Sequence, residues 1–346
     1  MKAFTFVRPV TIEEAAKAAA VKGSALKAGG IDLLHRMKER VDEPERVVWL
    51  GDVPNSTLRS IESGASPIRG WTGVRIGGGV TLAEIAASEL IRKEVPALAN
   101  AAGSAASPQI RARATLAGNL CQHTRCGYYR HASFPCLKRG DASCPVLADG
   151  AVQETAAIFG NSLCASAHAS SLAPVLAACD ASVVVQRAAN NQDGDARMPL
   201  AQFYAPPQRG VTSDTSLGAG DVVVCVLVPT ATWKRCVYEE VRQRAAFDWA
   251  LVSCAVCFGQ VNPGVDGKVQ SGYFARIWLG GVAPTPWRAE AAERIWATGG
   301  QLTDETIAAA AEAAVAGATP LPGNAYKVDL VKVVVRRALE RLRNMK

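Results

Sequence analysis

The sequence predicts an α+β protein, in which helices and antiparallel strands form separate layers. Two features of the element order predict this class. Short strands and helices alternate over about the first 55 residues, whereas three strands in succession between 235 and 284 are followed by helices alone. The chain has 346 residues, of which 49% are hydrophobic and 20% charged, so it is long and apolar enough to form a sizeable core.

The N-terminal part is expected to have the element order β-α-β-α-β. A capping box at Thr11 to Glu14 begins a helix over the Ala-rich stretch that follows. The stretch "ALKAGGIDLLHRMK" predicts a strand, a glycine turn and a helix, and "ERVVWLGDV" predicts a short strand. We expect short strands between 58 and 82, and then two helices in "LAEIAASELIRKEVPALANAAGSAAS", one of which ends near Pro96.

The second half of the chain is expected to begin with a helix that leads into a strand, "LAPVLAACDASVVVQ". We expect a surface hairpin loop at 187–198, a loop with a short turn in "PLAQFYAPP" and a strand in "DVVVCVLVP". Three antiparallel strands and three helices complete the chain: "RCVYEEVRQR", "ALVSCAVCFGQV", "SGYFARIWLGGVAP", "WRAEAAERIWATG", "TDETIAAAAEAAVAG" and "KVDLVKVVVRRALERLRNM". The predicted domains are 1–57, 58–228 and 233–346.

The chain carries no stretch that predicts a membrane span or a secretory signal. No run of about 18 apolar residues occurs, and the N-terminus starts directly with a strand and a helix. We expect the cytoplasm by default, while export to the periplasm with a signal-bearing partner is compatible with the sequence. The net charge is +7 without a block of Lys and Arg, which argues against nucleic-acid binding.

Basic residues gather around a group of cysteines: Arg111, Arg113, Arg125, Arg130, Lys138 and Arg139. Four interpretations remain open from the sequence. The group forms a solvated face, contacts a phosphate, docks a partner, or balances the charge of an anionic metal site.

The ten cysteines fall into two classes by position. Cys225, Cys254 and Cys257 lie in apolar strands and Cys179 follows an apolar helix, so these are expected to be small buried hydrophobes. Cys236 fits either class.

The other five cysteines lie in a loop-like excursion at 121–165, the cysteine loop. Disulfides are not expected in a large chain without a secretory signal, and the paired spacing of a zinc site is absent. Four of these thiols are candidate ligands of a [4Fe–4S] cluster: Cys126, Cys136, Cys144 and Cys164. Zinc and unligated thiols stay open as alternatives, and Cys121 has the weakest claim.

Three glycine-containing turns are candidates for contact with a phosphate group: "KAGGIDL" at 27–33, "IGGGVTLAEI" at 76–85 and "ATLAGNL" at 114–120. Glycine lets backbone N–H groups approach an anion closely. None of the turns has the dinucleotide-binding G-x-G-x-x-G pattern. The three turns could wrap one extended diphosphate, although ordinary strand-to-helix turns have the same composition.

Taken in order, five stretches resemble the FAD-binding medium subunits of molybdenum hydroxylases: "KAGGIDLL", "IGGGVTLAEI", "ASPQIRARATLAGNL", "LAPVLAACDA" and "ARIWLGGVAPTPWRAEAAE". This family includes subunits of carbon monoxide dehydrogenase, xanthine dehydrogenase, 4-hydroxybenzoyl-CoA reductase and aldehyde oxidoreductase. The resemblance implies a two-lobed FAD-binding domain, like that of vanillyl-alcohol oxidase and p-cresol methylhydroxylase (PCMH). A C-terminal antiparallel sheet with helices would follow it.

The resemblance also implies the cofactors and their ligands. Residues expected to contact FAD are Lys27, Ala28, Gly29, Gly30, Ile31, Asp32 and Leu33, then Ala106, Ser107, Ile110, Thr115, Gly118, Asn119 and Cys121, with Asp180 and Val223 as further candidates. The stretch "GNLCQHTRCGYYRHASFPCLKR" is similar to the subgroup, notably aldehyde oxidoreductases, whose flavin subunit carries a [4Fe–4S] cluster. The four candidate cysteines of the cysteine loop would ligate it.

The implied function is electron transfer with no catalytic residue in this chain. Partners would be a molybdopterin-binding large subunit, where the organic substrate reacts, a [2Fe–2S] small subunit and an external electron acceptor. The four histidines, His35, His123, His131 and His168, are expected to be surface or supporting groups. Two alternatives remain: a subunit of a 4-hydroxybenzoyl-CoA reductase-like enzyme with inward electron flow, and a non-catalytic zinc-binding scaffold.

Two positions depart from the family pattern. Many relatives have Ser-Asp where this chain has Ser170-Ser171, and many have a lysine near the flavin where this chain has Glu240. The second departure argues against electron transfer to nicotinamide cofactors.

Overall fold

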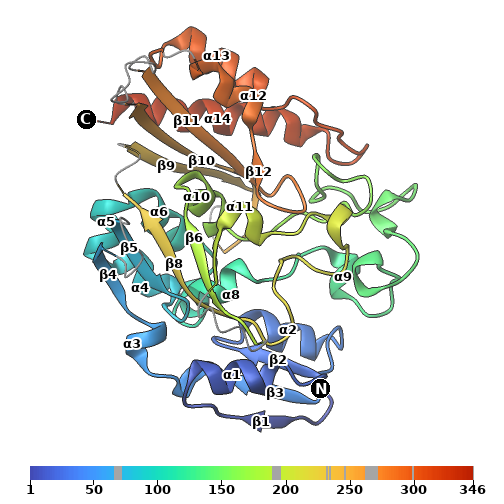
Figure 1. Ribbon diagram of the computed structural model, residues 1–346. Helices are drawn as coiled ribbons and strands as arrows, with labels where there is room; N and C mark the ends of the chain where they lie inside the picture. The colour runs from blue at the N-terminus through green and yellow to red at the C-terminus, as the bar shows by residue number, and fades with distance from the viewer. Residues whose placement is uncertain are drawn as a thin grey trace.

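The computed structural model describes residues 1–65, 72–188, 196–230, 233, 235–244, 247–261, 272–297 and 300–345. Its described strands form three sheets, and the predicted α+β class is confirmed. In Figure 1 the N-terminal sheet (blue) lies at one end and the C-terminal sheet (orange and brown) at the other, with the middle sheet between them. The cysteine loop, which includes α9 (Gly127–Arg130), projects to one side.

The N-terminal sheet has the order β1-β3-β2 and is parallel throughout. Its elements are β1 (Thr5–Val7), α1 (Ile12–Ala19), β2 (Ser24–Lys27), α2 (Ile31–Lys38) and β3 (Arg46–Trp49), as predicted. The side chain of Thr11 caps α1 by accepting the N–H of Glu14. The Glu14 carboxylate accepts the N–H of Val10 at 3.0 Å, one residue outside the expected capping box.

The middle sheet has the order β4-β5-β8-β6-β7, with antiparallel neighbours. Its strands are β4 (Ile61–Ala65), β5 (Thr72–Gly77), β6 (Ser182–Gln186), β7 (Ala196–Pro199) and β8 (Val222–Pro229). β8 is buried along most of its length because both faces are covered. Most of the hairpin loop predicted at 187–198 lies outside the described residues.

The helices beside the middle sheet differ from the prediction in one respect. Residues 82–104, all described, form three helices where two were predicted: α4 (Leu82–Ala87), α5 (Glu89–Glu94) and α6 (Pro96–Ser104). The side chain of Ser88 accepts the N–H of Ile91 and so begins a new helix within the expected first one. Pro96 starts α6, where its missing N–H costs nothing, so the prediction that a helix ends near it holds.

Short helices occupy the segments that lead to the site. They are α3 (Asn55–Leu58), α7 (Pro108–Arg111), α8 (Leu116–Leu120), α10 (Leu172–Ala178) and α11 (Leu200–Phe203). Short 3-10 turns occur at Leu50–Asp52, Leu137–Arg139, Pro145–Leu147 and Pro207–Arg209. The helical turn α11 lies within the loop with a short turn that was predicted at 199–207, and Leu200 and Phe203 at helical spacing both bury their side chains.

The C-terminal sheet has the order β12-β11-β10-β9, and its strands are antiparallel. Its elements are β9 (Arg235–Arg242), β10 (Ala250–Val261), β11 (Gly272–Gly280), β12 (Trp287–Arg288), α12 (Glu290–Glu293), a 3-10 turn (Arg294–Trp296), α13 (Asp304–Ala313) and α14 (Tyr326–Asn344). Alternate residues of β10 face opposite sides. Cys254 and Val256 pack under α13 and α14, whereas Ala255 and Cys257 join the core that contains α10.

Two of the hydrophobic clusters join neighbouring layers. One connects α1 to the middle sheet through residues such as Ala15, Val48 and Val224. The large central cluster includes α6, α10 and one face of the C-terminal sheet. Because apolar surface is continuous across both junctions, the three sheets support one another, while the predicted domain boundaries stay a prediction. In the described part of the chain, no helix is long and apolar enough to cross a membrane.

Substitution of Trp296 tests the packing of the core under the C-terminal helices. Its side chain is 1% exposed and its ring packs edge-on against Phe258 at 6.1 Å. Trp296→Ala should lower the free energy of unfolding by about 3–5 kcal/mol, because it leaves a large cavity. Chemical denaturation measures this. Val152→Ala, at a position 69% exposed, is the control and should change little. Equal effects of the two substitutions would contradict the packing.

Candidate functional site

The three glycine-containing turns converge on residues 113–118. In the turn at 27–33, a side chain at Gly29 would run into the backbone carbonyl of Arg113, so the two chains touch. In the turn at 76–85, the N–H of Ala117 donates to Gly78 O at 2.9 Å, and the N–H of Leu116 donates to Val80 O at 2.8 Å. Segments far apart in the sequence therefore meet at the start of α8.

Val223 lies beside these turns, because the neighbouring Val224 carbonyl accepts the N–H of Gly78 at 2.7 Å. A side chain at Gly78 would meet the carbonyl of Val223. Gly30 precedes α2 with φ of 83°, a left-handed conformation that glycine adopts without strain. The glycines are thus required where two backbone segments approach closely, whether or not a ligand is bound.

Two cations lie close enough at the converging turns to influence each other electrostatically. Burial lowers the pKa of Lys27, and repulsion from the charge of Arg113 lowers this pKa further. The Lys27 ammonium also lies over the ring of Trp49, 5.6 Å from its centre. Among the described residues no carboxylate forms an ion pair with either Lys27 or Arg113. Two neighbouring cations beside close-packed backbone turns form a positive site that suits an anion.

Asn119 lies in the third turn and contacts the segment just before α10, and Cys121 follows this turn. The hydroxyl of Ser170 donates to Asn119 Oδ1 at 2.6 Å. Burial raises the pKa of the Cys121 thiol to about 12, so this thiol stays protonated. Thr115 caps α8 by accepting the N–H of Gly118. These predicted residues therefore lie together in one continuous segment.

Four other residues that were predicted to contact FAD lie outside the converging turns: Ala106, Ser107, Ile110 and Asp180. Ala106 has φ of 47°, and its carbonyl accepts a hydrogen bond from Arg111 at 2.7 Å. Ser107 caps α7 through the N–H of Ile110. Asp180 lies at the end of α10, where its carboxylate is 3.8 Å from Arg276 of the C-terminal sheet.

Asp32 connects the first glycine turn to the cysteine loop. Its carboxylate lies 2.6 Å from Arg130, 3.1 Å from Arg125 and 3.2 Å from Arg36, and it accepts the N–H of His123 at 3.2 Å. Burial raises the pKa of Asp32, but the three guanidinium groups outweigh this and lower it overall. The Asp32 carboxylate is thus occupied by partners within the protein. A ligand at this turn could contact Asp32 only through its backbone.

The four candidate ligand thiols of the cysteine loop lie near one another. The neighbouring thiol of Cys144 lowers the pKa of Cys164 to about 6. Burial raises the pKa of Cys126, and the nearby sulfurs of Cys136 and Cys164 add to this rise. Cys126 and Cys144 also pack on the small apolar cluster around Val146. The fold therefore brings together thiols spread over 39 positions of the sequence.

Hydrogen bonds within the cysteine loop fix its thiols. The Cys136 N–H donates to Asp141 Oδ2 at 2.6 Å, and the Cys126 N–H donates to Thr124 Oγ1 at 3.2 Å. Cys164 Sγ lies 3.3 Å from Ser166 Oγ. Among the described residues, no three of these loop sulfurs lie within 4.8 Å of one another, which is the spacing that suits a single metal ion.

Asp214 is a buried site residue that the sequence does not reveal. Its carboxylate lies 2.6 Å from Lys138 Nζ and 2.6 Å from His123 Nδ1. Burial raises the pKa of Asp214, but hydrogen bonds from His123 and Lys138 lower it well below its ordinary value. No local pattern marks Asp214, because both partners belong to the distant cysteine loop.

The solvated-face interpretation is wrong for two of the basic residues. Arg130 and Lys138 are 8% and 5% exposed, because each is held in a buried ion pair. Arg139 instead donates to the carbonyls of Tyr128 and Tyr129, at 2.9 and 2.6 Å. These cations fold the cysteine loop and leave a positive surrounding for its sulfurs.

The histidines are placed as supporting or surface groups. His123 pairs with Asp214, and His131 and His35 are exposed. His168 is buried with its ring 4.7 Å from that of Tyr204. Burial lowers the pKa of His168 to about 4, so its ring is neutral at neutral pH.

A cavity of about 460 Å³ lies between the cysteine loop and the C-terminal sheet. Its wall includes Cys126, Tyr128, His168, Trp249 and Lys327. The Lys327 ammonium donates to three backbone carbonyls at 2.9–3.0 Å. Burial lowers the pKa of Lys327 to about 7.

Glu240, at the departure from the family pattern, is held inside the protein. Its carboxylate accepts the Tyr238 hydroxyl at 2.9 Å and pairs with Arg242. Both carboxylate oxygens of this side chain are therefore occupied by neighbours within β9.

Residues 2–231 match the family model described as the FAD binding domain in molybdopterin dehydrogenase. Residues 237–342 match the CO dehydrogenase flavoprotein C-terminal domain. The chain belongs to the FAD-binding medium subunits of the molybdenum hydroxylases. The resemblance drawn from five short motifs is thus confirmed over nearly the whole of this FAD-binding subunit.

Individual relatives agree with this assignment. The FAD-binding subunit is 34% identical over 345 residues to the aldehyde oxidoreductase FAD-binding subunit PaoB of Escherichia coli (strain K12), with 99% of each chain covered. It is 28% identical to the carbon monoxide dehydrogenase medium chain of Hydrogenophaga pseudoflava, covering 97% of this chain and 96% of that one. A solved structure of carbon monoxide dehydrogenase from H. pseudoflava, which lacks the Mo-pyranopterin moiety, superposes with a TM-score of 0.70 at 26% identity, covering 99% and 97%.

Removal of the Asp214 carboxylate should destabilise the FAD-binding subunit. Asp214→Ala leaves the Lys138 ammonium buried without a counter-charge, which costs about 3–5 kcal/mol of unfolding free energy at neutral pH. Because folding lowers the pKa of Asp214, its contribution is present above the ordinary carboxyl pKa and is lost as the pH falls below it. The difference between the two proteins should therefore narrow in acid.

Chemical denaturation as a function of pH measures both effects. Asp304→Ala, which removes an exposed ion pair with Arg343, is the control and should leave the unfolding free energy nearly unchanged. A constant difference across the acid range would contradict the proposed charge pairing.

Proposed function

We propose that this chain is the electron-transfer flavoprotein subunit of a molybdenum-dependent hydroxylase of the aldehyde oxidoreductase type. Electrons from [2Fe–2S] clusters of a partner subunit would pass through FAD and a [4Fe–4S] cluster in this chain to an external acceptor. When bound, the flavin accepts one or two electrons and so connects one-electron centres to two-electron acceptors. The residues of this chain hold and tune the cofactors and perform no chemistry on the organic substrate.

The convergence of Lys27 and Arg113 at the glycine turns is the observation that carries this proposal. A dinucleotide presents a diphosphate, and two adjacent cations without a carboxylate partner among the described residues suit that charge. Thr115, Gly118 and the 27–33 backbone surround the same place. This supports the contacts proposed from sequence at 27–33 and 115–121, while those proposed at 106–110 stay a prediction and Asp180 has its own partner in Arg276.

The arrangement of the cysteine loop supports the [4Fe–4S] cluster. Four thiolates suit iron–sulfur chemistry, and a cube of four irons holds its sulfurs farther apart than a single zinc ion does. The sulfurs of Cys126, Cys136, Cys144 and Cys164 are neighbours but do not crowd around one point. Lys138 adds favourable charge, since its ammonium also lowers the pKa of Cys164.

The bridge through Asp32 supports transfer between the two cofactor sites. One carboxylate ties the first turn of α2, at the FAD turns, to Arg125 and Arg130 beside Cys126. The proposed sites therefore belong to one rigid network. Such rigidity favours electron transfer, because few groups must rearrange when charge moves.

The proposed partners are supported by the family and by the relatives. The matching family model describes an FAD binding domain in molybdopterin dehydrogenase, and the two relatives are a FAD-binding subunit and a medium chain. Substrate oxidation would occur in a molybdopterin-binding large subunit, with a [2Fe–2S] small subunit as electron donor.

Neutralising the two cations tests the FAD site. Lys27→Ala combined with Arg113→Ala should raise the dissociation constant for FAD by about tenfold or more, because hydrogen bonds to a charged group are lost. Flavin retained per chain and fluorescence titration of the deflavinated complex measure this. Arg337→Ala, at an exposed arginine of α14, is the control and should retain flavin. Unchanged flavin affinity in the double variant would exclude this placement.

Replacing one loop thiol tests the [4Fe–4S] cluster. Cys136→Ala should reduce iron and acid-labile sulfide in the anaerobically isolated complex while FAD stays bound, because the FAD turns lie outside the cysteine loop. Electron paramagnetic resonance of the reduced complex separates this cluster from the partner's [2Fe–2S] clusters. Cys254→Ala, at a buried cysteine in the C-terminal sheet, is the matched control. Iron content equal to that of the wild type in Cys136→Ala would contradict the proposed ligand set.

A further inference from the structure

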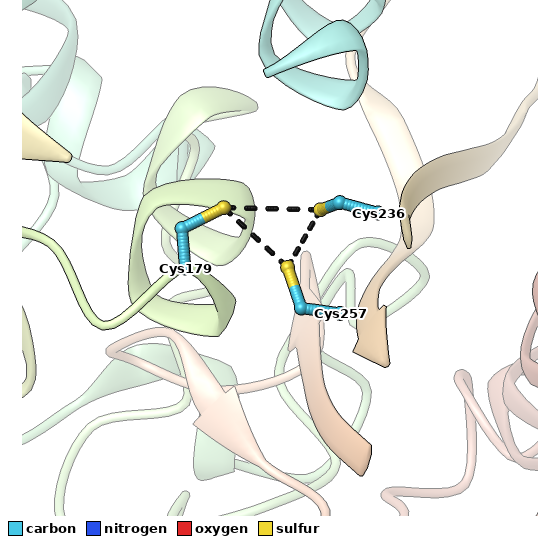
Figure 2. Close-up of side chains that lie close together, drawn as sticks. All are labelled: Cys179, Cys236 and Cys257. Carbon is cyan, nitrogen blue, oxygen red and sulfur yellow. Dashed lines mark hydrogen bonds between the residues drawn. The ribbon is translucent and has the colours of Figure 1, made fainter. Parts of the chain in front are cut away.

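Three cysteines outside the cysteine loop converge in the central core. The thiol of Cys257 donates to Cys236 Sγ at 2.6 Å, and Cys179 Sγ lies 3.4 Å from Cys257 Sγ and 3.8 Å from Cys236 Sγ. Figure 2 shows the three sulfurs pointing toward one another from three different elements. In the part of the chain that is described, they are the one group of three or more potential ligands close enough to hold a single ion.

The backbone explains why these thiols meet. Cys236 of β9 and Cys257 of β10 are direct partners in the antiparallel ladder, so their side chains share one face of the sheet. Cys179 ends α10, which packs on that face. Cys254, three residues before Cys257, points to the opposite face because strand residues alternate. The group therefore joins α10 of the FAD-binding part to the C-terminal sheet.

The surroundings of the three thiols are closed to water. Cys179 and Cys257 are 0% exposed and Cys236 is 2% exposed. Within the described residues, no imidazole or carboxylate joins the group at the same spacing. An ion bound here would therefore have sulfur ligands alone, at most three of them, and no coordinated water.

We propose that Cys179, Cys236 and Cys257 form a binding site for a monovalent copper ion. Thiolates are soft ligands that select monovalent copper, zinc or iron–sulfur clusters. Structural zinc is almost always four-coordinate, and a fourth ligand is lacking among the described residues. Monovalent copper is satisfied by two or three sulfurs, so it matches both the number and the kind of ligand.

Charge limits how many thiols lose a proton when copper binds. Thiolates are the ligands, so binding releases protons to solvent. Three thiolates around a monovalent ion would leave two negative charges in a core without water, which is unfavourable. We expect one sulfur to keep its proton, which leaves a single negative charge. Arg276, the ladder partner of Cys257 on β11, lies at the edge of the group, where the Asp180 carboxylate is 3.8 Å from its guanidinium.

The site has a structural consequence. A bound ion would link the end of α10 directly to the β9–β10 pair, across the packing of the FAD-binding part on the C-terminal sheet. Since the sulfurs are buried, copper would enter before α10 and the sheet have packed together. The test therefore supplies copper during synthesis of the protein.

The experiment uses the complete complex, isolated anaerobically from cells grown with added copper. Copper per chain is measured by mass spectrometry, and X-ray absorption at the copper edge reports the ligands. We expect about one copper per chain, with two or three sulfur ligands and no nitrogen or oxygen ligands. Cys236→Ala combined with Cys257→Ala should reduce the copper content about tenfold or more. Cys254→Ala is the matched control and should keep it.

Three outcomes would overturn the proposal: a wild-type complex without copper, equal copper in the double variant, or zinc or a Cys236–Cys257 disulfide in place of copper. Copper on the cysteine loop would be recognised because it persists in the double variant and disappears in Cys136→Ala. Flavin and iron contents are measured on the same samples. Failure of the copper site is thereby distinguished from failure of the proposed electron-transfer function.

Discussion

The partly buried carboxylate of Asp32 attaches the cysteine loop to the first glycine turn. Three guanidinium groups surround it, two of them from the cysteine loop and one from its own helix. The favourable charge interaction offsets the cost of burying Asp32, and the lowered pKa of Asp32 reflects that balance. Without this contact, the loop that carries the candidate cluster ligands would lose its attachment to the first glycine turn. The second attachment, through Asp214, Lys138 and His123, works by the same principle.

These ion pairs explain how a long excursion with little regular structure is ordered. The cysteine loop contains α9 and two 3-10 turns but no strand among its residues, all of which are described. Its order therefore depends on side chains that satisfy backbone groups, as Arg139 does with the carbonyls of Tyr128 and Tyr129. The basic residues that look like a surface patch in the sequence are mostly internal supports. Their positive charge remains near the sulfurs, where it favours an anionic cluster.

The C-terminal sheet contributes through its two faces. One face packs under α13 and α14 and forms a separate hydrophobic cluster that includes Trp296. The other face packs against α10 and completes the core of the FAD-binding part. The cavity between this sheet and the cysteine loop is lined by residues of both, including Cys126 and Leu251. The position of the C-terminal domain therefore shapes the surroundings of the cofactor sites without supplying a cofactor motif of its own.

The sequence by itself determined the class of fold, most of the elements and the family. Strand and helix periodicity is a local property, so β8, β10 and α14 were predictable, and five motifs were enough for the family. The prediction from local sequence was wrong where a single side chain determines a helix boundary. Ser88 caps a new helix and so divides one expected helix into two. The prediction also treated Cys179 and Cys257 as separate core residues. The meeting of Lys27 with Arg113, the partners of Asp32 and Asp214, and the group of three core thiols were decided by the tertiary structure alone. Each joins positions far apart in the chain, and no local pattern records which distant residues packing will bring together.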